Sequence, residues 1–264
     1  MKYRFANPEE RLRDVFESGF TARDIASALA SFDADTPSST AHSVMTEEAF
    51  KLAGVRVRGQ IAGYIDRDEL NGGTCGDYLH RFTPDATVQH TASFSEVVAA
   101  LADRERIFVS VFGEVGGLIT RRDMEKPPVR MWLFGFITLI EMQITRAVDT
   151  LFPTETWRQH VKEPRIAAAE KIRTERARWE QHVRLVECLQ FSDKAQILLQ
   201  IPEVRERLEI PSRRKGLERI RRIESLRNNL AHSQAIVSSD WPTIVDIAHD
   251  MEATLALVRG SDEA

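Results

Sequence analysis

The hexapeptide RNNLAH at positions 227–232 carries side chains that can act on a phosphodiester. Arg227 keeps its charge at any physiological pH and can grip a phosphate with its planar guanidinium, whereas His232 can exchange protons near neutral pH. Neither side chain needs a metal for this chemistry. The pair suits cleavage of RNA, whose own 2′-hydroxyl supplies the nucleophile, and Asn228 would orient the imidazole or the scissile phosphate.

The spacing within the hexapeptide decides how many copies of the chain such a site needs. At about 100° per residue of α-helix, Asn228 and His232 share a face, but Arg227 and His232 diverge by about 140°. One straight helix cannot direct all three side chains at the same phosphate. We therefore expect a second copy of the chain, related by a twofold axis, to complete the site. The structural alternative is a helix-terminal His232 that contacts carbonyls and an Arg227 paired with a neighbouring Glu.

The segment that leads to the hexapeptide is basic, although the protein has a net charge of −4. Residues 213–227 contain seven Arg or Lys residues against two Glu residues. A stripe of this kind attracts phosphates, so we expect Arg214, Arg219 and Arg222 to contact RNA. The competing interpretation is an ordinary solvated helix face.

Length and composition predict a globular protein of two domains. The 264 residues exceed the roughly 100–200 typical of one domain, and 42% hydrophobic with 29% charged residues is an ordinary balance. No apolar secretion signal is visible, and Cys75 and Cys188 form no zinc or disulfide pattern, so we expect a cytoplasmic protein without a catalytic metal. The apolar run 131–140 ends at Glu141, too short for a membrane span, and predicts a core or dimer-interface helix.

An internal repeat organises the first half of the chain. Residues 63–70, GYIDRDEL, return as GLITRRDM at 117–124, an offset of 117 − 63 = 54 residues. Periodicity predicts, for the second copy, a helix at 93–103 and a hairpin of strands at 107–113 and 115–120. For the first copy it predicts a loop at 35–40, a helix at about 45–52 and strands at 55–57 and 61–65. We expect the two copies to pack face to face.

After Pro127 and Pro128 the strand signals largely vanish. Apolar spacing and the prolines between segments predict helices at 130–151, 163–189, 193–199, 213–232 and 242–258. The predicted fold class is therefore an α+β amino-terminal domain, residues 1–125, followed by an all-α helical bundle, residues 126–264.

The amino-terminal domain, with repeats at about 20–75 and 84–125, resembles a tandem CBS-domain pair. The resemblance rests on residues 117–123, GLITRRD, which match the family's Gly-apolar-apolar-Thr/Ser-x-x-Asp element. It implies a regulatory adenine nucleotide, AMP, ATP or a cyclic oligonucleotide, near Gly117. Thr120 would contact phosphate or ribose, and Asp123 would accept hydrogen bonds from ribose hydroxyls.

The first copy departs from this element, with Asp66 in place of the Thr and Glu69 in place of the Asp. An anionic Asp66 disfavours a nearby phosphate, so we expect at most one competent nucleotide site. The structural alternative for the second copy is that Gly117 only serves the hairpin and Asp123 only caps the next helix.

The carboxy-terminal domain resembles the HEPN superfamily, whose helical domains often act as dimeric, metal-independent ribonucleases. The family motif is Arg, a polar residue, three further residues and His, which Arg227, Asn228 and His232 match. The two resemblances together imply a homodimeric endoribonuclease regulated by an adenine nucleotide, with a toxin-like role. The alternatives are a non-catalytic nucleotide sensor or scaffold and an RNA-binding protein that does not cleave.

Overall fold

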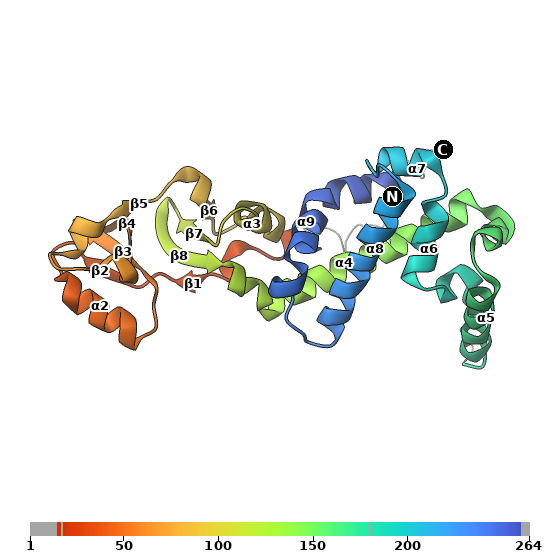
Figure 1. Ribbon diagram of the computed structural model, residues 1–264, viewed down its shortest axis with the longest axis horizontal. Helices are drawn as coiled ribbons and strands as arrows, with labels where there is room; N and C mark the ends of the chain where they lie inside the picture. Colours follow the sequence, from red (N-terminus) through yellow and green to blue (C-terminus); the bar gives the residue numbers. More distant parts are fainter. Residues whose placement is uncertain (1–14, 17, 180, 260–264) are drawn as a thin grey trace, which may run out of the picture. The chain divides into compact units, whose positions relative to one another are not determined.

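The computed structural model describes residues 15–16, 18–179 and 181–259, with side chains as far as residue 249 (Figure 1). The described residues divide into two compact units, 18–129 and a second unit made of 15–16 with 130–259. They are called the α/β unit and the helical unit below. The boundary lies four residues beyond the one predicted from sequence, and Phe16 belongs to the helical unit rather than to the α/β unit.

The α/β unit consists of two copies of one arrangement of strands, helix and hairpin (Figure 1). The first copy contains η1 (Ala22–Asp24), β1 (Ser27–Ala28), β2 (Ser31–Asp33), α2 (Ser38–Glu47), β3 (Leu52–Val57), β4 (Gln60–Asp66) and η2 (Arg67–Glu69). The second contains η3 (Cys75–Tyr78), β5 (His80–Arg81), η4 (Pro84–Ala86), β6 (Thr87–Gln89), α3 (Phe94–Leu101), β7 (Arg106–Val111), β8 (Glu114–Thr120) and η5 (Arg121–Glu125). Both hairpins recur at the offset seen in the sequence, 106 − 52 = 54 and 114 − 60 = 54. The predicted repeat and its hairpins are confirmed.

The two copies exchange their first strands. One sheet has the order β2-β3-β4-β5 and the other β1-β8-β7-β6, so β1 joins the sheet of the second copy and β5 that of the first. These exchanged strands pair antiparallel, whereas β2 with β3 and β6 with β7 pair parallel. Leu52, Phe108 and Val115 bury a common apolar cluster, with Tyr64 and Phe82 packed against it. Neither copy could bury this surface alone.

Each hairpin turns through two residues with positive φ, Arg58-Gly59 and Phe112-Gly113. Positive φ at both central positions is the geometry of the two-residue turn that matches the twist of paired strands. Gly accepts it freely, whereas Arg58 and Phe112 adopt a conformation that is uncommon for residues with a side chain.

The described elements of the helical unit are all helices. They are α4 (Pro127–Leu151), of which residues from 130 onward belong to this unit, η6 (Pro153–His160), α5 (Glu163–Ala177), η7 (Leu185–Cys188), α6 (Phe191–Leu198), α7 (Pro202–Arg207), α8 (Arg213–Ala231) and α9 (Val237–Arg259). One part of its core joins the end of α4 to the following segments through Val148, Trp157, Ile166 and Leu185. A mixed α/β part followed by a mostly helical part confirms the predicted fold class at that level.

Helix α4 has one buried face and one exposed face. Trp132, Leu133 and Phe136 are buried, and Phe16 packs on Phe136 over Gly135, where a larger residue would meet the Phe16 ring. Among the described residues, α4 is the helix whose length and apolarity would suffice to cross a membrane, and half of its most apolar window is buried within the protein. That burial agrees with the predicted core helix.

Two helix predictions were wrong in their extent. The predicted helix 163–189 ends at Ala177, and the chain resumes as the short helix η7 at Leu185. The predicted helix near 45–52 begins earlier, at Ser38, directly after Pro37. The segment 35–40, predicted as a loop, therefore contains the first turn of α2 and its buried Ser38.

The last helix also begins earlier than predicted. The sequence SSDWP at 238–242 is typical of a helix cap and predicts a helix that starts at Pro242. In the structure α9 begins at Val237, and Pro242 lies inside it. The cap-like Asp240 is instead buried, and its carboxylate accepts hydrogen bonds from side chains of other residues. Sequence cannot distinguish an Asp that caps its own helix from one that holds a neighbouring helix.

The close approach of the exchanged strand β5 to β4 gives a test of the sheet. A Cβ at Gly63 would lie 2.1 Å from the backbone carbonyl oxygen of His80, whereas one at Gly116 meets nothing within 4 Å. We therefore expect Gly63→Ala to destabilise the protein by about 1–3 kcal/mol and Gly116→Ala to change it by less than about 0.5 kcal/mol. Calorimetric unfolding of both variants measures this, and equal shifts of Tm would contradict the strand exchange.

Candidate functional site

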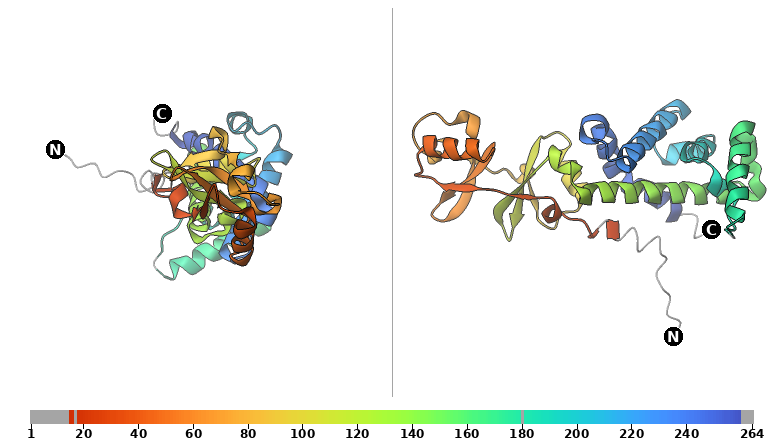
Figure 2. Two further views of the ribbon diagram at one scale, coloured as in Figure 1. Left: turned by 90° about the vertical axis from the view of Figure 1, so that its left-hand side faces the viewer. Right: turned by 90° about the horizontal axis from the view of Figure 1, so that it is seen from below.

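The last turn of α8, which contains the hexapeptide, is held by Arg130 of α4. The Arg130 guanidinium donates hydrogen bonds to the backbone carbonyls of Asn229 at 3.0 Å, Leu230 at 3.3 Å and Gln234 at 2.9 Å. The last carbonyls of a helix have no partner inside the helix, so a cation there satisfies them and interacts favourably with the helix dipole. Figure 1 and the right-hand view of Figure 2 both show α8 next to α4.

A second contact fixes the same turn from α9. The Asn229 side-chain amide donates a hydrogen bond of 2.7 Å to the carboxylate of Asp240, and the Ser239 hydroxyl donates one of 2.8 Å to the same oxygen. Asp240 is buried, so this carboxylate is stabilised by donors rather than by water. Sequence analysis missed Arg130, Asn229 and Asp240, and the only signal was that Asn229 lies within the hexapeptide.

The three predicted catalytic side chains have different surroundings. Arg227 points to α4, where its Nη1 lies 3.6 Å from Oε2 of Glu141, and 35% of its side chain is exposed. Asn228 and His232 are exposed, and no hydrogen bond or ion pair joins their side chains to the described residues. The backbone N–H of His232 donates to the carbonyl of Asn228 and ends the helix. A single chain therefore presents His232 to solvent and Arg227 to a carboxylate.

The predicted RNA-binding arginines are partly neutralised by acidic neighbours. Arg214 lies 3.5 Å from Glu218, and Arg222 lies 3.0 Å from Asp246 on α9. Burial lowers the pKa of the Arg219 guanidinium, while the charge of Asp246 acts in the opposite direction. Exposed ion pairs such as those of Arg214 and Arg222 are weak and exchange readily with a phosphate, whereas Arg219 is partly buried, so the stripe offers a ligand less charge than the sequence implies.

In the second copy of the repeat, Thr120 and Asp123 contact each other. Oδ2 of Asp123 accepts hydrogen bonds from the backbone N–H of Thr120 at 2.7 Å and from its hydroxyl at 2.8 Å. The ammonium of Lys126 lies 2.7 Å from Oδ1 and also reaches the Ser27 hydroxyl at 3.3 Å. Thr120 is therefore the N-cap residue of η5, and Asp123, the third residue of that helix, completes a capping box with it. Gly117 pairs with Val109 across the hairpin.

The equivalent positions of the first copy are occupied in a different way. Asp66 is buried, and its carboxylate accepts a hydrogen bond from the backbone N–H of Asp68. Glu69 contacts Nε2 of His80 on the exchanged strand β5 at 2.5 Å. Both carboxylates have local partners, and the negative charge of each would repel a phosphate.

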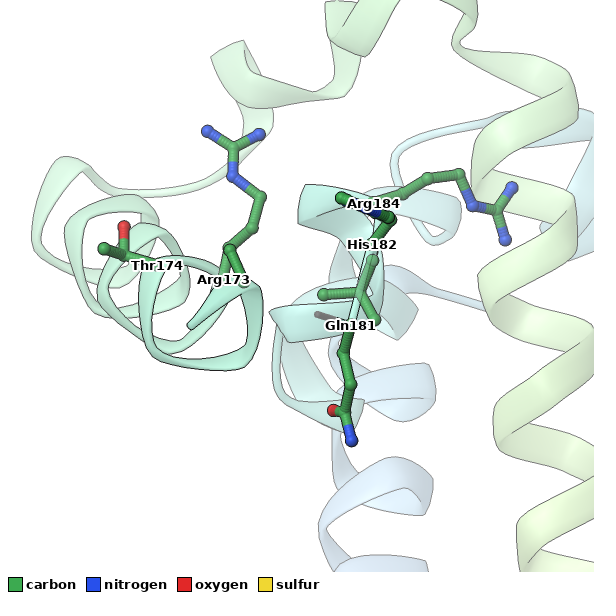
Figure 3. Close-up of a pocket in the computed structure, with 7 residues that line it drawn as sticks. Arg173, Thr174, Gln181, His182 and Arg184 are labelled. Carbon is green, nitrogen blue, oxygen red and sulfur yellow. The ribbon is translucent and has the colours of Figure 1, made fainter. Parts of the chain in front are cut away.

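A cavity of about 490 Å³ lies between the end of α5 and the segment before η7, and it contains none of the predicted site residues (Figure 3). Its lining residues are Arg173, Thr174, Ala177, Gln181, His182, Val183 and Arg184. The side chains of Arg173 and Arg184 point in different directions in Figure 3, and Arg184 pairs with Asp149 and Glu187. The cavity therefore lacks converging cations for an anion.

No family model and no curated protein matches this chain. Similar solved structures include CBS-domain proteins, the family that the repeat resembles. A conserved CBS-domain protein of unknown function from Thermoplasma acidophilum is 16% identical over 44% of this chain and 75% of that protein, with a TM-score of 0.35. A CBS-domain-containing protein from Bacillus anthracis is 15% identical over 42% and 94%, with a TM-score of 0.37.

The structure of CBSX2 in complex with AMP is 16% identical to this chain over 40% of its length and 93% of that chain, with a TM-score of 0.35. A second structure of CBSX2, from Arabidopsis thaliana, is 15% identical over 39% and 90%, with a TM-score of 0.34. At this identity and coverage the likenesses concern the fold alone.

The contacts of Arg130 predict a local effect of its removal. Arg130→Ala should cost about 1–3 kcal/mol of stability and speed hydrogen exchange of the amides at 232–234, because the carbonyls of Asn229, Leu230 and Gln234 lose the guanidinium that holds this turn against α4. Arg213→Ala, an exposed Arg at the opposite end of α8, is the matched control. Exchange at these amides that is as slow in Arg130→Ala as in the control would refute the clamp.

Proposed function

We propose that the protein is a metal-independent endoribonuclease that acts as a homodimer and whose α/β unit binds a regulatory adenine nucleotide. The observation that carries the proposal is an exposed His232 at a helix end that Arg130 and Asp240 fix in place, five residues after Arg227. An imidazole held on a rigid turn but left open to solvent is suited to exchange protons with a bound substrate.

In the proposed reaction the 2′-hydroxyl of RNA attacks the adjacent phosphorus, and the bond to the 5′-oxygen of the next nucleotide breaks. His232 moves the proton that the hydroxyl loses or that the leaving oxygen gains. Arg227 stabilises the charge on the phosphorus oxygens, and Asn228 orients the phosphate or the imidazole. The products carry 2′,3′-cyclic phosphate and 5′-hydroxyl ends.

A second copy of the chain completes the site because Arg227 and His232 leave α8 in different directions. The face of α4 that its own unit leaves exposed supports such a dimer. Met131, Phe134 and Met142 are three and eight residues apart, which places them on one face of the helix, and Met131 is 59% exposed. An apolar stripe of this spacing is typical of a helix that packs against another helix.

A second function is favoured by the ion pairs of the helical unit. Arg227 faces Glu141, and Arg214 and Arg222 also have carboxylate neighbours, as in a helix whose cations serve stability. In that function the helical unit is a dimerisation or partner-binding scaffold for a nucleotide sensor. An RNA-binding protein that does not cleave is the intermediate case.

The nucleotide is proposed for the second copy of the repeat. Thr120 offers a hydroxyl, and Lys126 brings a cation within 2.7 Å of Asp123, so an anionic ligand meets less repulsion there than beside Asp66 in the first copy. The Asp123 carboxylate would exchange its contact with Lys126 for ribose hydroxyls, which leaves the ammonium available to a phosphate.

Cleavage of RNA tests the first part of the proposal. Arg227→Ala and His232→Ala should each lower the rate by at least about 100-fold in the presence of chelator, because each removes a group that acts on the reacting phosphate. Lys171→Ala, an exposed residue of α5, should retain the rate, and a DNA strand of the same sequence should stay intact. Cleavage that survives both substitutions rejects the site, and binding without cleavage favours the intermediate case.

Calorimetric titration with AMP and ATP tests the second part. Asp123→Ala should weaken binding by about tenfold or more, since a ribose loses a charged hydrogen-bond acceptor. Glu69→Ala changes the equivalent carboxylate of the first copy and should leave binding within about twofold. If Asp123→Ala binds as tightly as the unaltered protein, the assigned ribose contact is wrong.

A further inference from the structure

Lys194 of α6 is a buried cation that the proposed reaction does not use. Its side chain is 4% exposed, and its neighbours Ala195, Ile197 and Leu198 are buried apolar residues. Its ammonium lies 3.1 Å from Oε1 of Glu141 on α4. A charge buried in this way is costly unless it has a partner, and Glu141 supplies a contact at hydrogen-bond distance, while Glu187 is close enough to interact with Lys194 electrostatically.

The same carboxylate faces Arg227 with its other oxygen. Oε2 of Glu141 lies 3.6 Å from Nη1 of Arg227, a longer separation than the 3.1 Å between Glu141 and Lys194. Two cations therefore share one anion, and the group of three keeps a net charge of +1. Lys194 is buried and Arg227 is about one-third exposed, so the side of this group that a ligand can reach is the guanidinium.

We infer that Lys194 is a positioning residue that acts through Glu141 to keep the charge of Arg227 available for a phosphate. The inference rests on the proposed function of Arg227 in binding the scissile phosphate. A carboxylate drawn towards a buried ammonium neutralises a second cation only in part, because its field is shared. Without Lys194, Glu141 has Arg227 as its remaining cation and competes with the substrate for it.

Three variants separate this role from a structural one. Lys194→Met keeps the length of the side chain in an apolar site but removes the charge, and kcat/KM for RNA should fall about two- to fivefold, the range of a partly exposed ion pair. The double variant Lys194→Met/Glu141→Gln removes the competing carboxylate as well, and kcat/KM should return to at least the original value. Lys171→Met on the surface of α5 is the matched control.

The chemical reactivity of Arg227 can be measured without any assay of RNA cleavage. Phenylglyoxal modifies free guanidinium groups, and peptide mass spectrometry gives its rate at Arg227 alone. The rate should fall about two- to fivefold in Lys194→Met and recover in the double variant. If the protein cleaves no RNA while these rates change as expected, the nuclease proposal fails and the electrostatic role stands.

Two results would overturn the inference. One is an unchanged modification rate of Arg227 in Lys194→Met. The other is a loss of rate and kcat/KM in Lys194→Met that the double variant fails to restore, since that pattern is the one expected of a lysine needed only for packing. Thermal unfolding of each variant identifies a change that comes from loss of the fold.

Discussion

The last carbonyl groups of a helix such as α8 have no N–H donor inside the helix. The guanidinium of Arg130 donates hydrogen bonds to the carbonyls of Asn229 and Leu230 in the last turn and of Gln234 just after it. Asp240 fixes the same turn through the Asn229 amide. His232 is the residue at which this helix ends, so its position is set by backbone contacts rather than by any contact of its imidazole. The turn is held from α4 and α9 and the imidazole is exposed, and the proposed chemistry needs both properties.

In the helical unit, Arg and Lys side chains lie beside carboxylates that neutralise part of their charge. Arg222 of α8 lies beside Asp246 of α9, whereas Arg214 lies beside Glu218 of α8 itself. Glu141 differs because a buried lysine shares it with Arg227. The number of charged residues in the sequence does not show how strongly each cation attracts a ligand. That attraction depends on which carboxylate lies beside the cation in the folded protein.

Elements with a local signal were predictable, and elements defined by distant partners were not. The hairpins β3–β4 and β7–β8 have short apolar runs joined by turns that contain glycine, and the 54-residue repeat located them. The exchanged strands β1 and β5 are two residues each, too short for a periodic signal. At the candidate site the sequence identified Arg227 and His232 by residue type, but the contacts of Arg130, Glu141 and Asp240 depend on how α4 and α9 meet α8.

In the proposed dimer, Arg227 of one copy acts beside His232 of the other. Complementation tests it directly: Arg227→Ala and His232→Ala proteins are purified separately, mixed under conditions that exchange subunits, and assayed on labelled RNA in chelator. A mixed dimer has one site with both groups intact, so we expect the mixture to recover about a quarter of the original activity or more, whereas each variant alone stays inactive. A mixture of freely exchanging subunits that remains as inactive as its components would contradict the shared site.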